Sequence, residues 1–304
     1  MTALGAPRDV VEVGVVARRA LADGAQGHVA AAFERSCYIE IEGAWACVGP
    51  LELGSSPLNV LLSWVGRPRL PARGEPVQVL GPLLLIGDVV RASLRHAAVW
   101  HPAPPAAWTP TTLDAGLKAF DALTEGPPPR DAFRLIRPSA EADATPALAA
   151  AARGPARGLA ELLRKGFALP GPERELDGSV CQDLLGLGPG LTPSGDDVIG
   201  GALLALALVG RNDLRDRLWA SLRERAAIAT NPISLAHLSA AAEGYGAAAL
   251  HDALASLLAG AVERLPAALA RLDTLGHSSG WDGLAGALIA LRAFRDASHP
   301  PLGE

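Results

Sequence analysis

Residues 187–197 read LGPGLTPSGDD and run directly into an apolar segment, residues 198–209. Glycine and proline fix an irregular backbone here, and Ser194 stands three residues before Asp197, the spacing of a helix N-cap with a capping box. A helix start presents unpaired N–H groups and the positive end of a dipole, and such starts bind phosphate or carboxylate groups. The stretch predicts a helix start capped by Ser194 and indicates an anion site, although an ordinary cap gives the same signal.

A second copy of this pattern, GHSSGWD at residues 276–282, precedes another apolar segment near the C-terminus. Aligned without a gap, the two copies share a Ser-Gly-x-Asp core and a later glycine: Ser194 and Ser279, Gly195 and Gly280, Asp197 and Asp282, Gly201 and Gly286. We hypothesise two pseudo-equivalent helix starts that converge on one ligand. Glycines lower helix propensity by about 1 kcal/mol each relative to alanine, so those following the two starts indicate close backbone approach between packed helices: Gly200, Gly201, Gly283 and Gly286.

Length and composition indicate a well-buried globular protein with one large or two ordinary domains. The 304 residues are 49% hydrophobic and 19% charged, and the net charge of −5 comes with no basic stripe, so nucleic-acid binding is not expected. Cys37, Cys47 and Cys181 lack disulfide or zinc spacing and favour a reducing cytoplasm, with small apolar filling as their role. No signal sequence opens the chain, and the longest apolar run falls short of the ~20 residues of a membrane span, so we expect a soluble protein.

The first part of the chain is expected to be rich in β-structure. β-Branched and alternating runs predict strands at residues 11–16, 37–42, 44–48, 77–80 and 83–86. Such short strands favour a small barrel or sandwich. Asn59 ends a long turn in this part, where it could bind substrate or simply hold the turn.

The rest of the chain is expected to be helical. Alanine- and leucine-rich segments predict helices at residues 113–124, 146–166, 196–209, 212–229, 233–243, 247–260, 262–273 and 281–296, the second interrupted near Gly154-Pro155. The fold class is therefore α+β, a β-rich barrel- or sandwich-like N-terminal unit followed by a mainly α-helical C-terminal unit. We assign residues 1–110 to the β-rich domain, 111–176 to a linker with helices, and 177–304 to the helical domain that carries the glycine-rich loops.

The candidate site residues gather at the helix starts. We assign catalysis to Asp196, Asp197 and His277, and substrate binding to Asn59, Gly188, Gly190, Thr192, Ser194, Gly195, Thr230, Ser278 and Ser279. The adjacent carboxylates suit a general base, the orientation of an amine or Mg²⁺ ligation. We expect Asp197 to turn back into the cap and Asp196 to face the ligand. No metal site is assigned, because no third carboxylate stands nearby in sequence.

Two further features concern the ligand. His277 precedes two serines, but adjacent side chains do not readily form a nucleophile–base pair, so hydrogen bonds to an anionic or carbonyl ligand are the better interpretation. Thr230 opens a third hydroxyl-rich helix start, where it or Ser234 either approaches the same ligand or serves a plain loop and cap. No arginine stands in these loops. An anion would rest on backbone amides and hydroxyls, or on an arginine from elsewhere or from a partner subunit. His237, His251 and His299 lie on presumed helix surfaces or near the tail and are interpreted as ordinary surface or buried residues rather than ligands.

Three motifs together resemble the AllH family, long described as a domain of unknown function. They are GPGLTPSGDD at residues 188–197, GHSSG at 276–280, and the turn 49–59, which begins Gly-Pro and ends Pro-Leu-Asn. The similarity covers most of the chain, from about Ser36 to Phe294, and the decapeptide is a specific signature.

The resemblance implies a cytoplasmic subunit of oxamate carbamoyltransferase, an enzyme of anaerobic allantoin degradation and so of purine catabolism. It implies partner subunits, one of them resembling an acyl-CoA synthetase. The implied reaction moves a carbamoyl group between carbamoyl phosphate and oxamate, giving oxalurate and phosphate in one direction. Every participant is a small anion or carries a carbonyl, which suits helix N-termini and amide donors.

Three functional hypotheses follow. In the first, the chain is a subunit of a carbamoyltransferase-like enzyme: the 188–195 loop, Thr192 and Ser194 bind a phosphate or carboxylate, Asp196 orients or deprotonates the amide nitrogen, and His277, Ser278 and Ser279 hold the transferring carbonyl. In the second, it is a non-catalytic subunit that binds an anionic metabolite or assembles such a complex. The third is a stand-alone metal-dependent hydrolase. No cofactor is assigned, and Mg²⁺ is the only candidate.

Overall fold

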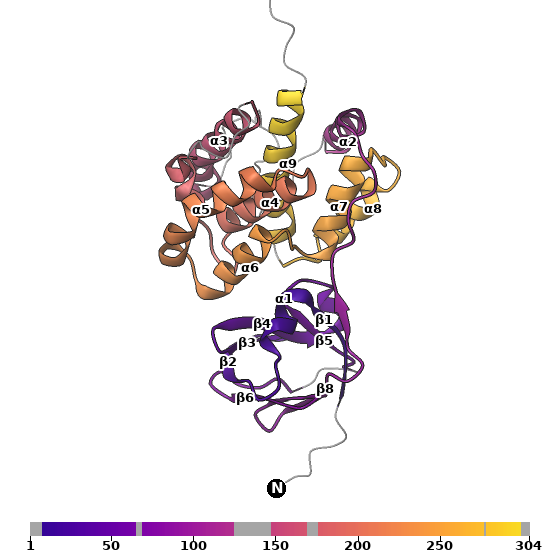
Figure 1. Cartoon of the computed structure of the whole chain (residues 1–304), viewed down its shortest axis with the longest axis vertical. Coiled ribbons are helices and arrows are strands. Elements are labelled where there is room, and N and C mark those ends of the chain that lie inside the picture. The colour runs from indigo at the N-terminus through magenta and orange to yellow at the C-terminus, as the bar shows by residue number, and fades with distance from the viewer. Residues whose placement is uncertain (1–7, 65–68, 125–146, 169–175, 277, 299–304) are drawn as a thin grey trace, which may run out of the picture. The chain divides into compact units, whose positions relative to one another are not determined.

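The computed structural model describes residues 8–64, 69–124, 147–168, 176–276 and 278–298. The chain divides into two compact units, Met1–Pro102 and Ala103–Glu304, the first built of strands and the second of helices (Figure 1). The predicted α+β class is confirmed. Within the described residues, no helix combines the length and the apolar character needed to cross a bilayer.

The N-terminal unit is a mixed β-barrel. Its strands follow the order β5-β4-β3-β2-β6-β7-β8-β1, pairing between β1 and β5 closes the ring, and β9 lies outside it beside β1. The elements are β1 (Arg8–Gly14), α1 (Val15–Ala20), β2 (Gln26–Ala32), β3 (Cys37–Ile41), β4 (Ala44–Pro50), η1 (Leu51–Leu53), β5 (Asn59–Leu62), β6 (Pro76–Leu80), β7 (Leu83–Ile86), β8 (Val90–Ser93) and β9 (Ala98–Trp100).

Alternation of apolar side chains produces the barrel core. Along β3 the residues Cys37, Ile39 and Ile41 are buried while those between them are half-buried, and a tight turn through Glu42 and Gly43, both at positive φ, returns the chain into β4. The predicted strands at 37–42, 44–48, 77–80 and 83–86 are confirmed within one or two residues.

The predicted strand at residues 11–16 is partly wrong, because β1 ends at Gly14 and Val15 begins the short helix α1. The N–H groups of Val16 and Ala17 both donate to the carbonyl of Pro57, at 3.0 and 2.9 Å. A Cβ on Gly14 would lie 2.1 Å from the carbonyl oxygen of Ser56. Gly14 therefore leaves room for the turn at residues 56–57, whose Pro57 carbonyl accepts hydrogen bonds from the first N–H groups of α1. The apolar pattern of the sequence does not show this contact.

The C-terminal unit is helical throughout its described residues. The elements are α2 (Pro110–Leu123), α3 (Ala147–Ala168), η3 (Gly178–Val180), η4 (Gln182–Leu184), α4 (Ser194–Leu208), α5 (Asn212–Ala229), α6 (Pro232–Ala242), α7 (Ala248–Ala259), α8 (Leu265–Leu272) and α9 (Ser279–Ser298). Each predicted helix is present. The predicted break at Gly154-Pro155 is wrong, because α3 continues through Pro155. Burial of Ala152, Leu159 and Leu163 along one face of α3 offsets the cost of an internal proline.

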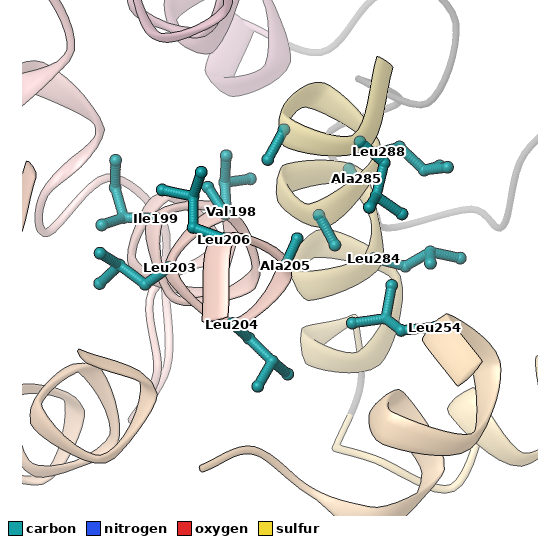
Figure 2. Packing of buried hydrophobic residues seen from close by; sticks show 14 of the residues in the cluster. Val198, Ile199, Leu203, Leu204, Ala205, Leu206, Leu254, Leu284, Ala285 and Leu288 are labelled. Carbon is teal, nitrogen blue, oxygen red and sulfur yellow. The ribbon is translucent and has the colours of Figure 1, made fainter. Parts of the chain in front are cut away.

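The helices α4 and α9 form the centre of this unit (Figure 1). Figure 2 shows them side by side, with the small side chain of Ala205 between them and the larger Ile199 and Leu203 on the far side of α4. All three side chains are buried. Because α4 is surrounded by protein on nearly every side, it shows little of the one-sided pattern typical of a surface helix.

Candidate functional site at the starts of α4 and α9

The start of α4 differs from the predicted cap. Pro193 is the N-cap residue, with φ −51° and ψ 139°, Ser194 is already inside the helix, and no side chain caps it. The N–H groups of Asp196 and Asp197 donate to the carbonyl of Pro193 at 2.9 and 3.1 Å. The predicted capping box is therefore wrong. Proline fixes the chain direction and its own carbonyl accepts the first bonds, which leaves the Ser194 hydroxyl for other partners.

The two helix starts lie against each other, as hypothesised. The hydroxyl oxygens of Thr192 and Ser279 are 2.9 Å apart, and those of Ser194 and Ser278 are 3.5 Å apart. These pairs join segments more than eighty residues apart in sequence, as the separations of 87 and 84 residues show. Four of the predicted substrate-binding hydroxyls thus form one cluster.

The helices meet through a reciprocal pair of glycine contacts. A Cβ on Gly201 would lie 1.8 Å from the carbonyl oxygen of Gly283, and a Cβ on Gly286 would lie 1.8 Å from that of Val198. In the alignment of the two copies, Gly201 matches Gly286 and Val198 matches Gly283, so each contact is the mirror of the other. A local pseudo-two-fold axis therefore relates α4 and α9.

The prediction of close backbone approach is confirmed for these two glycines only. A Cβ on Gly200 would meet nothing nearer than the Cβ of Ala241 at 3.7 Å, and one on Gly283 would meet the flexible end of Leu250 at 3.2 Å. Gly200 lies beside the crossing, whereas Gly283 takes part in it through its carbonyl oxygen and not through the absence of its own side chain.

Asp196 does not face a ligand as expected. Its side chain is buried, its Oδ1 accepts from the N–H of Gly186 at 2.8 Å, and its Oδ2 accepts from the hydroxyls of Ser234, at 2.6 Å, and Thr230. Both oxygens are thus used to tie the loop before α4 to the start of α6. This arrangement makes Asp196 a positioning residue and gives Thr230 a structural partner.

Asp197 lies on the side of α4 that meets α9. Neighbouring residues of a helix point about 100° apart, so Asp197 turns away from Asp196 and toward the second helix start. It does not turn back into the cap as expected. Its Oδ2 atom is buried and has no hydrogen-bond partner among the described residues.

Burial raises the pKa of the Asp197 carboxyl well above its ordinary value. Hydrogen bonds from Ser279 and Thr192 act against this rise in the pKa, while the neighbouring carboxyl of Asp282 adds to it. Asp282 is the match of Asp197 in the second copy and is fully buried. Two carboxyl groups therefore lie together where the two helices begin.

The loop before α4 has the irregular backbone that its glycines predict. Gly188 and Gly190 have φ of 126° and 98°, and a Cβ on Gly195 would lie 1.9 Å from the carbonyl oxygen of Leu184. Within the described residues, the N–H groups of Gly190 and Thr192 donate no hydrogen bond. The loop thus offers backbone donors beside the hydroxyl cluster.

Asn231 and Ser234 belong to the third helix start predicted from the sequence, but the role of Asn231 was missed and the Ser234 hydroxyl donates to Asp196. Asn231 accepts from the N–H groups of Ile233 and Ser234 and so caps α6, while its Nδ2 donates to the carbonyl of Leu191 at 2.8 Å. The sequence could have predicted the capping role of Asn231, because Asn-Pro before an apolar run is a strong signal for a helix start. Nothing in the sequence points Ser234 toward Asp196.

The remaining candidates lie in the N-terminal unit, in α7 or outside the described residues. Asn59 lies in β5 of the N-terminal unit, where its Nδ2 donates to the carbonyl of Gly54 at 2.8 Å and holds the turn. His277 lies outside the described residues. His251 is buried, which is one of the two alternatives expected for it, and its Nε2 accepts from the N–H of Gly246 at 3.1 Å. Burial lowers the pKa of His251 to about 4. His299 also lies outside the described residues.

Metal ligation receives no support from the side-chain arrangement. Among the residues that the structure describes, no group of three or more histidine, cysteine, aspartate or glutamate side chains is placed to hold a metal ion. Asp196 and Asp197 point apart, and the described side chains around them are hydroxyls and the single carboxyl of Asp282.

Comparison with known proteins finds a family that resembles this part of the chain. Residues 184–291 match the family model described as oxamate carbamoyltransferase subunit AllH. This segment of the helical unit is therefore similar to AllH. The AllH segment, residues 184–291, begins at the last residue of η4 and ends inside α9, so it contains both helix starts and the whole hydroxyl cluster. No solved structure matches the chain significantly.

The hydroxyl cluster of the AllH segment gives a direct test of the pairing. We expect Thr192→Val and Ser279→Ala to show a coupling energy of about 0.5–1.5 kcal/mol in a double-mutant cycle, because each removes the same half-buried hydrogen bond. Unfolding of the four chains by urea measures it. In the control cycle, Thr192→Val with Ser256→Ala on α7 should be additive, since Ser256 bonds only within its own helix. Additivity in both cycles would show that the two starts are not in contact.

Proposed function

We propose that this protein is a subunit of a carbamoyltransferase-like enzyme and that the paired starts of α4 and α9 bind a small anionic substrate. The observation that carries the proposal is the convergence of two helix starts inside the AllH segment. Each helix N-terminus carries roughly half a positive charge. Two starts side by side, with backbone donors and hydroxyls but no arginine in their loops, suit a phosphate, carboxylate or amide carbonyl.

Each group of the site has a proposed role. The backbone of residues 188–195 and the hydroxyl of Thr192 would bind the phosphate or carboxylate. Ser278 and Ser279 would hold the carbonyl of the transferring group. Asp196 would position the loop through Gly186 rather than take a proton. The reaction proposed is transfer of a carbamoyl group between carbamoyl phosphate and oxamate, in a complex with other subunits that include an acyl-CoA-synthetase-like protein.

One observation favours the second hypothesis, a subunit that binds the metabolite without catalysing. Both oxygens of Asp196, the base expected from the sequence, are occupied by protein donors. In this version the paired helix starts bind the anion while a partner subunit supplies the acid–base groups.

The two versions are separated by one set of measurements. The tagged full chain, purified with its bound partners, should release phosphate from carbamoyl phosphate only when oxamate is present. We expect Ser279→Ala to weaken binding of carbamoyl phosphate or oxamate about tenfold in calorimetry, the effect of ~1.4 kcal/mol. Ser256→Ala is the matched control and should bind normally. A loss of binding with an unchanged turnover number supports the metabolite-binding version, and no saturable binding of either compound to the complex overturns both.

A further inference from the structure

Two carboxyl groups beside the proposed anion site pose an electrostatic problem, because Asp282 is fully buried and the Oδ2 atom of Asp197 is buried as well. Two ionised carboxylates would carry two negative charges into a space that already has little water, and they would repel the proposed ligand. The two helix dipoles together compensate roughly one charge. Two neighbouring buried carboxyls that cannot both ionise hold one proton as a pair.

Among the described residues, no cation lies beside Asp197 to balance its charge. Its charged neighbours that shift its titration are Asp282 and Asp196, both acidic. On α6, which also packs against α4, the titratable side chain is His237; burial lowers its pKa to about 4, so it is neutral at pH 7. The charged residues near the end of α5 and in η4 are exposed to solvent: Arg223, Glu224, Arg225 and Asp183.

We propose that Asp197 and Asp282 hold one proton between them at neutral pH, so that the pair carries one negative charge instead of two beside the bound ligand. The buried Oδ2 of Asp197, which has no partner among the described residues, is the atom that carries the proton. A neutral carboxylic acid at this place removes one negative charge from the site, and the weaker repulsion favours an anionic ligand.

Asp282 is the positioning residue of this pair. Its fully buried side chain sits on the opposite helix start, at the position that matches Asp197. The glycine contacts between Gly201 and Gly283 and between Gly286 and Val198 fix the two first turns together. The ligand half of the proposal rests on the proposed function, whereas the shared proton does not.

The test is the carboxyl-carbon NMR spectrum of the full chain labelled with ¹³C-aspartate, recorded without ligand across pH 4 to 9. We expect one aspartate signal at the protonated position at pH 7. It should vanish in Asp197→Asn, which has nearly the shape of the protonated acid. In Asp282→Asn the Asp197 signal should titrate at a lower pH, a change that a merely structural role of Asp282 would not produce.

Asp213→Asn is the matched control. Hydrogen bonding to Arg211 lowers the pKa of Asp213 to about 2, so its signal is ionised throughout and its loss should leave the protonated signal unchanged. A wild-type spectrum with every aspartate ionised at pH 7 overturns the shared proton, whether or not either variant folds. A protonated signal without binding of carbamoyl phosphate or oxamate overturns only the ligand half.

Discussion

Gly201→Ala should lower the free energy of unfolding of the helical unit by about 3 kcal/mol. The added Cβ would lie 1.8 Å from the carbonyl oxygen of Gly283, far inside van der Waals contact. That oxygen belongs to the backbone of α9, which cannot move without shifting the whole helix. Alanine's better helix propensity, about 1 kcal/mol, is too small to offset the clash. Thermal or urea unfolding followed by far-ultraviolet circular dichroism measures the change.

The adjacent residue supplies the control. Gly200 lies in the same helix, but its added Cβ would be 3.7 Å from the nearest atom, an ordinary contact. Gly200→Ala should therefore leave the stability unchanged or raise it by up to ~1 kcal/mol. Gly286→Ala should behave like Gly201→Ala, because its Cβ would meet the carbonyl oxygen of Val198 at the same distance of 1.8 Å. Equal effects at 200 and 201 would contradict the reciprocal contact.

Asp196→Ala should cost about 3 kcal/mol or more of unfolding free energy. The buried carboxylate accepts three hydrogen bonds, from the N–H of Gly186 and the hydroxyls of Thr230 and Ser234. Its removal leaves these donors without an acceptor and opens a cavity. The same chemical denaturation measures the loss, and ligand binding should fall with it because the loop before α4 loses its attachment.

Asp196→Asn should be milder, with a loss of about 1 kcal/mol. The amide oxygen can still accept from Gly186, and the two hydroxyls can reverse and accept from the amide nitrogen. Asp213→Ala is the surface control: its ion pair with Arg211 is exposed, and such pairs contribute about 1 kcal/mol or less. If Asp196→Ala were as mild as that control while catalysis was abolished, Asp196 would be a catalytic residue after all.

Much of the helical unit could be predicted from the sequence, because its helices follow a strong apolar pattern and lie between Gly and Pro breakers. The Ser-Gly-x-Asp repeat located the two helix starts, and their contact through Thr192 and Ser279 follows from it. In the barrel, short strands such as β5 and β8 were not predicted. Four residues are too few to show a period, and their partners come from distant parts of the chain.

The fine arrangement of the site could not be predicted for a physical reason. Which of two adjacent carboxylates faces which neighbour depends on the rotation of α4 about its own axis. That rotation is set by Gly201 packing under Gly283 and not by the residues of the loop. The same rotation turns Asp196 toward Ser234. Asp196, which the sequence predicts to be a base, therefore fixes the loop before α4 instead.

The contact between α4 and α9 also determines when the site can form during protein synthesis. The two helix starts are separated by four intervening helices, α5 to α8, so α4 leaves the ribosome well before α9 exists. Until α9 is made, the backbone at Val198 and Gly201 lacks the helix that packs against it. The hydroxyl cluster also lacks Ser278 and Ser279. Closure of such a long loop is slow relative to the folding of a local helix pair. We therefore expect ligand binding to be the last property this unit acquires as it folds, and the first that it loses when α9 detaches.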